Sequence, residues 1–298
     1  MEPQLRVPTV LYVVVLKQKK NIQKALCNLQ VITFELKSKE GIIFEEELLN
    51  KSNKFAKIMT ITSIIMAILA VTFGGLLPII DDNKTLPLGA FPEYINLDLS
   101  FEIKVLIQTV MFYIFGLSYM FGDAVYATML IHIRAHCKIL QISLKSNYKN
   151  GKNFLKNKLK NIVFYHNTII SISRETENMF KYHILLSFMG ISFVICCSMY
   201  EMSSSQTLDS NVIKNFLIIL TLEFPVGIYC YLGHEVIVES QNIADACFQE
   251  ENFETDLQFQ KGLILIMRRS QVAITPTIGK LKPLSLITFV GVSKFICF

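Results

Sequence analysis

The sequence predicts an all-α membrane protein, a polytopic helix bundle that forms one domain over residues 1–298. Three observations predict this class. Hydrophobic residues make up 52% of the chain and charged residues 18%, against about 25% charged in an average soluble domain. Four long stretches are almost uniformly apolar. Lysine and arginine are abundant in alternate segments between those stretches and scarce in the others.

The four apolar stretches are long enough to cross a bilayer as helices, since a hydrocarbon core of about 30 Å takes about 20 helical residues. They are residues 58–80, 105–131, 183–200 and 212–233. None alternates with the period of two that a membrane β-strand requires, and a helix satisfies its own backbone hydrogen bonds in lipid. A fifth stretch, 283–298, reaches the end of the sequence. We therefore expect four full spans and a partial last span.

The distribution of lysine and arginine predicts the direction of each span, because cytoplasmic segments hold an excess of both residues. The counts are ten, one, ten, none and five in the successive segments 1–57, 81–102, 132–182, 201–211 and 234–282. This alternation fits all four full spans. We therefore expect the N-terminus inside the cell and the partial last span running outward.

The segments 132–182 and 234–282 are predicted to be cytoplasmic helical extensions of the spans. In 152–182 apolar residues recur at roughly helical spacing between lysines. The stretch "TDLQFQKGLILIM" (255–267) is apolar enough to need a packing partner. We interpret the lysines as a solvated face near anionic lipid. Nucleic acid is not an expected partner, because it requires a basic face with stacking aromatics on a soluble fold.

The sequence contains no constellation typical of an enzyme or a metal site. The His234-Glu235 pair is not part of an HExxH motif, because position 238 is valine, and a catalytic zinc needs two histidines one turn apart plus a third ligand. His132 and His136 have the spacing of a metal pair, but only Cys137 lies nearby to complete the set. There is no Ser-His-Asp order and no glycine-rich phosphate loop. We expect no enzyme activity, no cofactor and no metal.

Two acidic residues, Asp123 and Glu223, lie inside predicted spans. Burying a charge in a membrane costs free energy, so such a residue is a candidate functional group. Glu223 precedes Pro225 by two residues, and a proline frees a backbone carbonyl and can kink the helix. Two roles stay open for these acids: hydrogen bonding inside the bundle, and a part in ligand or ion access.

A stripe of aromatic residues in span 105–131 predicts a ligand pocket. Its members recur at steps of three, four and seven residues on one helical face, and span 183–200 carries a similar stripe. An apolar cavity with a few hydroxyls suits a small, weakly polar ligand bound mainly by burial. The candidate pocket residues are Phe112, Tyr113, Phe115, Ser118, Tyr119, Met189 and Phe193. The alternative is that these side chains pack against other helices or lipid.

Two N-glycosylation sequons, at Asn50 and Asn83, test the predicted orientation. They lie on opposite sides of span 58–80, so at most one of them can be glycosylated. We predict that Asn83 carries the glycan and Asn50 does not.

Motifs in the second half of the sequence resemble those of the insect odorant receptors. The clearest are "YCYLGHEVIVESQNIADACF" (229–248), "LILIMRRSQ" (263–271) and "LSLITF" (284–289), which are similar to the family's C-terminal signature. Further support comes from "LPLGAFPEY" (86–94) and "GDAVYATMLIHIRAHCKIL" (122–140). Each motif alone is weak, but the set is specific, and the resemblance covers about residues 50–298.

The resemblance implies seven helices whose cytoplasmic extensions form an anchor. It implies a ligand-tuning subunit of an odorant-gated, non-selective cation channel in the plasma membrane of olfactory sensory neurons. The partners would be a small volatile apolar odorant, the lipid bilayer, and co-receptor subunits in a hetero-oligomer that we expect to be a tetramer. The pocket would be lined by 58–80, 105–131 and the outer part of 183–233. Segment 237–275 would contact neighbouring subunits, and 283–298 would begin the pore-lining helix.

Two other interpretations of function stay open. A G-protein-coupled type of chemoreceptor without a pore would have an outside N-terminus and an arginine motif after its third span. A non-functional fragment of an odorant receptor is the second alternative, and it rests on departures from the family pattern. Only the short apolar stretch 7–16 precedes span 58–80, where the family has two full spans, and the sequence contains no tryptophan and ends in "VGVSKFICF". From these departures we expect a truncated gene model, a pseudogene product or a partial isoform.

Overall fold

The computed structural model describes residues 41–80, 100–145, 152–204, 210–248 and 256–297, apart from some side chains within the helices. The described helices are α2 (Gly41–Ile80), α3 (Phe101–Lys145), α4 (Lys152–Ser204), α5 (Ser210–Cys247), α6 (Leu257–Ser270) and α7 (Leu286–Cys297). Two short strands, β1 (Thr277–Ile278) and β2 (Lys282–Pro283), lie between α6 and α7. The prediction of an all-α helix bundle is therefore confirmed.

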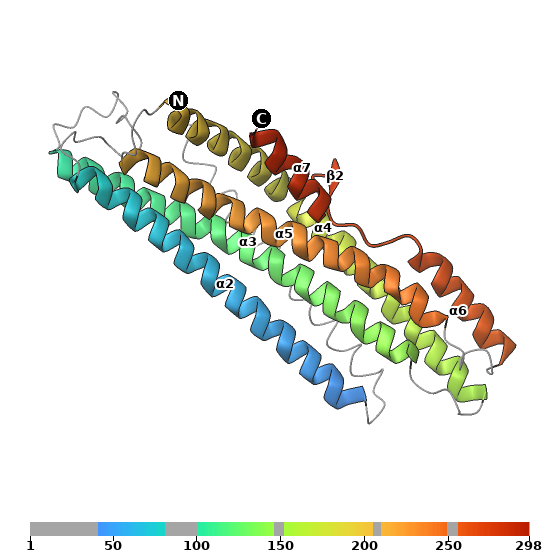
Figure 1. Ribbon diagram of the computed structural model, residues 1–298. Helices are drawn as coiled ribbons and strands as arrows, with labels where there is room; N and C mark the ends of the chain where they lie inside the picture. The colour runs from blue at the N-terminus through green and yellow to red at the C-terminus, as the bar shows by residue number, and fades with distance from the viewer. Residues whose placement is uncertain (1–40, 81–99, 146–151, 205–209, 249–255, 298) are drawn as a thin grey trace, which may run out of the picture.

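The four long helices α2 to α5 run side by side as an elongated bundle (Figure 1), with α3 in contact with each of the other three. Parts of both predicted extensions are continuous with spans: residues 132–145 with α3, 152–182 with α4 and 234–247 with α5. The 53 residues of α4, for example, form one helix of about 80 Å. This length exceeds a hydrocarbon core of about 30 Å, so a large part of α4 must lie outside a membrane that the helix crosses.

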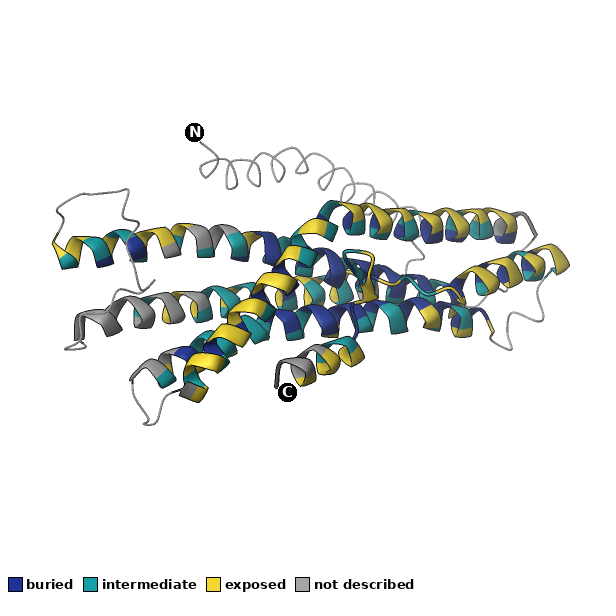
Figure 2. Ribbon diagram, turned by 90° about the horizontal axis from the view of Figure 1, so that it is seen from above, coloured by how far each residue is buried: buried dark blue, intermediate teal, exposed yellow. Residues whose placement is uncertain are grey.

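The two halves of the bundle bury their side chains differently. We call the end where α3 and α5 finish and α4 begins the lysine-rich end. The half nearest this end has a core like that of a soluble protein, in which Cys137, Leu140 and Val236 are fully buried. In the other half fewer of the described residues are buried (Figure 2), and large apolar side chains are exposed, including Leu106 and Ile114 on α3. A concentration of exposed apolar side chains on one half is what a lipid-facing region next to a water-facing one requires.

Two of the described helical stretches, Leu155–Ser203 and Asn215–Cys247, are long and apolar enough to cross a membrane by length and composition. They contain the predicted span 183–200 and most of 212–233. The predicted spans 58–80 and 105–131 lie within α2 and α3, where some side chains lie outside the described part. The number of spans and the orientation of the termini stay predictions.

The connection between α6 and α7 differs from the expected helical segment 234–282, because residues 271–285 are not helical. The strands pair antiparallel, with Thr277 opposite Pro283. Gly279 and Lys280 both have positive φ, 56° and 66°, and the Leu281 amide donates to the Ile278 carbonyl at 2.9 Å. This is the geometry of a type I′ turn, which favours glycine. A Cβ on Gly279 would also lie 2.9 Å from the side chain of Leu185 on α4.

The short helix α6 is amphipathic, as the sequence of 255–267 predicts. Phe259, Leu263, Ile266 and Ser270 are buried, at the spacing of one helical face. This face packs against α4 and α5, while Ile264 and Leu265 on the other side are exposed. The helix therefore docks on the bundle and leaves a second apolar surface uncovered in the single chain.

Candidate functional site

A buried acid–histidine pair joins α3 to α4 near the middle of the bundle. The Nε2 atom of His183 lies 2.8 Å from Oδ1 of Asp123. Both side chains are shielded from solvent, with 6% of Asp123 and 14% of His183 exposed. Gly122 makes room for the imidazole, since a Cβ at that position would lie 3.0 Å from the His183 ring. The hydrogen bond from His183 satisfies one carboxylate oxygen of Asp123. Burying that oxygen without a donor would cost free energy.

Aromatic rings surround the pair and fill the space between α3, α4 and α5. The ring of Tyr119 lies 5.6 Å from that of His183, and Tyr126 packs 5.3 Å from Phe180. Tyr126 also meets Tyr229 of α5 edge-on at 5.6 Å. These centroid distances fall within the favourable range for aromatic pairs. The Asp123–His183 pair therefore lies beside a layer of aromatic side chains, which we call the aromatic layer: Tyr119, Tyr126, Phe180 and Tyr229.

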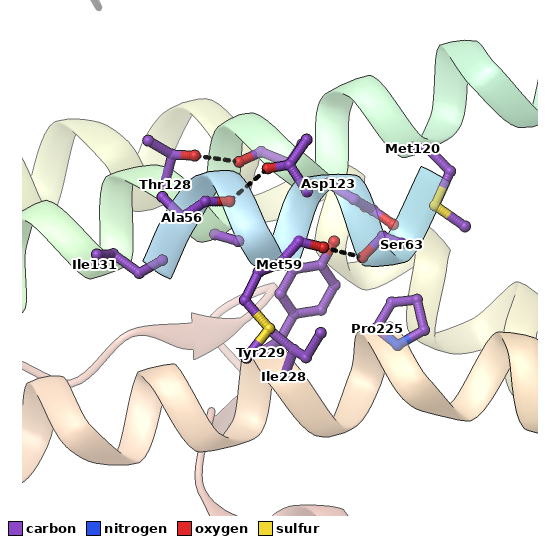
Figure 3. A pocket seen from close by; sticks show the side chains of 13 residues that line it. Ala56, Met59, Ser63, Met120, Asp123, Thr128, Ile131, Pro225, Ile228 and Tyr229 are labelled. Atoms are coloured by element: carbon purple, nitrogen blue, oxygen red, sulfur yellow. Dashed lines mark hydrogen bonds between the residues drawn. The ribbon is translucent and has the colours of Figure 1, made fainter. Parts of the chain in front are cut away.

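A small cavity lies beside Asp123, between α2, α3 and α5 (Figure 3). Its volume is about 20 Å³, which is room for about one water molecule. The lining residues are Ala56, Met59, Thr60, Ser63, Met120, Asp123, Ala124, Ala127, Thr128, Ile131, Pro225, Ile228 and Tyr229. The cavity is therefore mostly apolar, with a carboxylate and a few hydroxyls, but it is far smaller than the roughly 300 Å³ or more of a ligand pocket.

The structure brings only some of the predicted pocket residues near this centre. Tyr119 lies within it, and Tyr113 is half-buried on the same helix. Met189 and Phe193 lie on the outer face of α4, with 63% and 71% of their surface exposed. The other three candidates, Phe112, Phe115 and Ser118, belong to α3, but their side chains lie outside the described part. The pocket assignment as a whole stays a prediction.

The two predicted intramembrane acids differ in their surroundings. Asp123 makes an internal hydrogen bond to His183, and the cavity places it next to Tyr229 of α5. Glu223 is half-buried on α5, two residues before Pro225 inside the same helix. A part in ligand or ion access stays a prediction for both. Asn83, the predicted glycosylation site, lies outside the described residues.

A second polar cluster, which sequence reasoning missed, ties α3 to α5 nearer the lysine-rich end. Lys138 pairs with Glu239 at 3.0 Å, and the Gln141 amide donates to the same carboxylate at 2.9 Å. One turn away, Arg134 pairs with Glu235 at 2.8 Å. Glu235 of the His-Glu pair thus lies in an ion pair between two helices. These bonds join residues about a hundred positions apart in the sequence, and helical periodicity within one segment carries no signal for them.

Two described histidines of the lysine-rich half, His136 and His166, are buried, each with its own partner. His136 Nδ1 lies 2.7 Å from the Tyr165 hydroxyl, and burial lowers the pKa of His136 to about 3. His166 lies 3.5 Å from the Ser270 hydroxyl of α6, and burial and Arg269 lower its pKa to about 4. Within the described residues no group of three or more metal-binding side chains comes together.

The last helix, α7, begins against α5 at two glycines. A Cβ on Gly233 would lie 2.6 Å from the Leu284 carbonyl oxygen, and one on Gly227 would lie 3.7 Å from the ring of Phe289. The Leu284 amide donates to the Pro276 carbonyl at 2.8 Å, which fixes the start of α7 to the connector. Helix α5 therefore borders both the cavity and α7.

Long helices that lie side by side, with most of the exposed large apolar side chains on one half, define the class of this molecule as a helix bundle of the membrane type. Residues 10–297 match the family model of the 7tm odorant receptors. The chain belongs to this family, whose members are membrane proteins.

Individual relatives agree with this assignment. The chain is similar to a putative odorant receptor 92a of Drosophila melanogaster, 26% identical over 60% of this chain and 44% of the relative. It is 30% identical to odorant receptor 85b of Drosophila melanogaster over 43% of this chain and 32% of the relative. Odorant receptor 10 of Aedes albopictus is 23% identical over 82% of this chain and 66% of the relative. The match thus spans less than half the length of the first two relatives.

Solved structures show the same fold. The insect olfactory receptor OR5 from Machilis hrabei superposes with a TM-score of 0.81 at 17% identity, over 97% of this chain and 75% of that receptor. The same receptor in complex with eugenol gives a TM-score of 0.80. At this identity the likeness establishes the fold alone.

Proposed function

We propose that this chain binds a small volatile apolar odorant and tunes a non-selective cation channel formed with co-receptor subunits. The observation that carries the proposal is the position of α5. Pro225 and Tyr229 of α5 border the interior of the bundle. Gly227 lies against Phe289 of α7, and Gly233 lies against Leu284, two residues before α7 begins. A change of packing inside the bundle can therefore reach, through one helix, the element that would begin the pore lining.

We place the odorant pocket around the stretch of α3 from Phe112 to Asp123. Tyr119 lies at the aromatic layer there, and the solved relative whose complex contains eugenol has the same fold. The described cavity of about 20 Å³ is too small for an odorant. The pocket either enlarges as the ligand binds or is completed by residues outside the described part. Met189 and Phe193 stay candidates for the pocket, with lipid or subunit contact as their alternative.

We further propose that the lysine-rich end lies in the cytoplasm, with the N-terminus inside and Asn83 glycosylated outside, in the plasma membrane of olfactory sensory neurons. Ten lysines and arginines in segment 132–182 support this orientation. The water-soluble type of core in the same half of the bundle supports it as well.

The exposed face of α6 is proposed to contact a neighbouring subunit in the hetero-oligomer, expected to be a tetramer. Leu257, Ile264 and Leu265 are exposed there, at 63%, 59% and 67%. Apolar side chains on the water-facing part of a protein mark a surface that binds another protein. The opposite face of the same helix is already buried against the bundle.

The proposal is tested by recording odorant-evoked currents in a cell that lacks odorant receptors. The co-receptor is expressed alone, together with this chain, or together with this chain carrying Tyr119→Ala. We expect the chain to add responses to odorants that the co-receptor alone does not detect, and Tyr119→Ala to shift them. Surface labelling of each subunit controls for expression.

Two results would favour the alternatives. Responses that persist without the co-receptor and disappear with a G-protein inhibitor would favour a receptor without a pore. Currents identical with and without this chain, at equal surface expression of the co-receptor, would favour a non-functional fragment.

A further inference from the structure

We propose that the cavity between α2, α3 and α5 binds one ordered water molecule, which bridges Asp123 of α3 to Tyr229 of α5. The site is defined by two buried polar groups that face the same cavity and by hydroxyls that can complete the water's hydrogen bonds. It stands on the geometry of the single chain and does not depend on the proposed channel function.

The first anchor of the site is the second oxygen of Asp123. Oδ1 is engaged by His183 at 2.8 Å, but within the described residues Oδ2 has no hydrogen-bond partner. Only 5% of the residue is exposed. A buried carboxylate oxygen requires a donor, because it loses its hydration when the helices pack together.

The second anchor is the hydroxyl of Tyr229, which also has no hydrogen-bond partner among the described residues. The residue is 2% exposed, and its side chain reaches from α5 toward α2 and α3 (Figure 3). Tyr229 and Asp123 both line the cavity. The two groups are close neighbours, near the range of a direct hydrogen bond, but they do not meet the geometry that such a bond requires.

The remaining polar groups of the cavity can accept a hydrogen bond but have already donated their own protons. The hydroxyls of Thr60 and Ser63 on α2 donate to carbonyls one turn back, each at 2.9 Å. Thr128 on α3 does the same at 2.7 Å. Each keeps lone pairs for a donor from the cavity.

A water molecule fits this set of groups in number and in polarity. It can donate to Asp123 Oδ2 and to one of the cavity hydroxyls, and accept from the Tyr229 hydroxyl. The cavity of about 20 Å³ exceeds the roughly 10–15 Å³ that a water needs, and buried waters typically make about three hydrogen bonds. The water would hold α5 to α3 at the level where α2 meets both helices.

The direct test is a high-resolution cryo-electron microscopy map of the purified full-length protein in lipid nanodiscs. We expect a peak about 2.7–3.0 Å from both Asp123 Oδ2 and the Tyr229 hydroxyl, and its loss in Tyr229→Phe. The matched control is Tyr126→Phe, which removes a hydroxyl from an equally buried neighbour that does not line the cavity. A map that resolves other buried waters but shows no peak here would overturn the proposal, as would a direct Tyr229–Asp123 hydrogen bond.

Melting temperatures give a second test and separate water from a bound cation. They are measured with Na⁺ and with N-methyl-D-glucamine at constant ionic strength. We expect the same value in both salts. A melting temperature that rises in Na⁺, with the rise lost in Asp123→Asn, would replace the water by a cation and overturn the proposal.

Discussion

Gly233 of α5 and Leu284 of the α6–α7 connector approach so closely that a side chain on the glycine would collide with the leucine backbone. A Cβ on Gly233 would lie 2.6 Å from the Leu284 carbonyl oxygen and 2.7 Å from its Cβ. This contact positions the start of α7 on the bundle, and it provides the first of five predictions.

Gly233→Ala is expected to displace α7 and to lower the stability of the protein by about 1–3 kcal/mol, the usual range for forcing extra atoms into a packed contact. Odorant-evoked current should fall at equal surface expression. The control is Gly190→Ala, because a Cβ on Gly190 of α4 would meet nothing within 4 Å. Equal melting temperatures and currents for the two variants would show that the Gly233 contact is unimportant.

Removing His183 is expected to be more damaging than removing both members of its pair with Asp123. His183→Leu leaves the carboxylate buried without its partner, which costs about 3–5 kcal/mol in comparable pairs. The double variant His183→Leu with Asp123→Leu should regain part of that loss, because no charge remains. Thermal unfolding of both variants in nanodiscs measures the difference. Losses that simply add would exclude this account of the pair.

Of the two ion pairs between α3 and α5, the one at Glu239 should contribute more to stability. Its side chain is 12% exposed and accepts from both Lys138 and Gln141, whereas Glu235 is 24% exposed and Arg134 25%. Glu239→Ala should cost about 2–3 kcal/mol, because two donors lose their acceptor. Glu235→Ala should cost about 1 kcal/mol or less. Urea unfolding of the two variants measures the order, and the reverse order would contradict the prediction.

Acid should destabilise the lysine-rich half through its buried histidines. Burial lowers the pKa of His136 to about 3 and that of His166 to about 4, while both have ordinary values near 6.5 in the unfolded chain. Between the lowered pKa values of the folded state and the ordinary value near 6.5, these histidines bind more protons in the unfolded chain than in the folded one. The contribution of these neutral histidines to the stability of the folded state is therefore complete above pH 6.5. It is lost as the pH falls toward 4 and then 3.

The variant His136→Asn tests this pH dependence, because asparagine can keep the hydrogen bond to Tyr165 but does not titrate in this range. The melting temperature of the variant should fall less than that of the parent protein between pH 7 and pH 4.5. Parallel curves for the two proteins would assign the acid sensitivity to other groups.

Substitutions of Tyr119 and Met189 distinguish an odorant pocket inside the bundle from one that reaches the outer surface. Tyr119 lies in the aromatic layer around Asp123, while 63% of Met189 is exposed on α4. Tyr119→Ala should shift the half-maximal odorant concentration by about ten- to a hundredfold, which corresponds to about 1–3 kcal/mol, without preventing membrane insertion. Met189→Ala should alter tuning only if the pocket reaches the outer face of α4. Concentration–response curves over a broad odorant panel provide the measurement.

The helical class of this protein follows from its apolar stretches, because a chain in lipid must satisfy its backbone within each helix. The amphipathic pattern of 255–267 likewise predicted a docked helix, and α6 buries Phe259 and Leu263 as that pattern requires. These predictions depend on neighbouring residues along the chain. Local periodicity is sufficient to make them.

The candidate site was less predictable, because its pairs join residues far apart in the chain. Asp123 stood out as an acid in an apolar stretch, but its partner His183 lies 60 residues away and looked like the polar end of a span. Tyr229 was one of three aromatic residues in the motif 229–248. The close approach of Leu185 from α4 leaves no room for a side chain at Gly279. None of these contacts leaves a trace in the local sequence.

The connector between α6 and α7 is fastened at several points. The Thr277 hydroxyl bonds to Glu177 of α4, the Ile274 amide donates to the Ser240 hydroxyl of α5 at 2.9 Å, and Gly279 abuts Leu185. A tether of fifteen or so free residues would absorb movement of the bundle, since a flexible chain of that length spans many end-to-end distances. The connector of this protein has little freedom to extend. A sliding displacement of α4 relative to α5 is therefore expected to be transmitted to the first turn of α7.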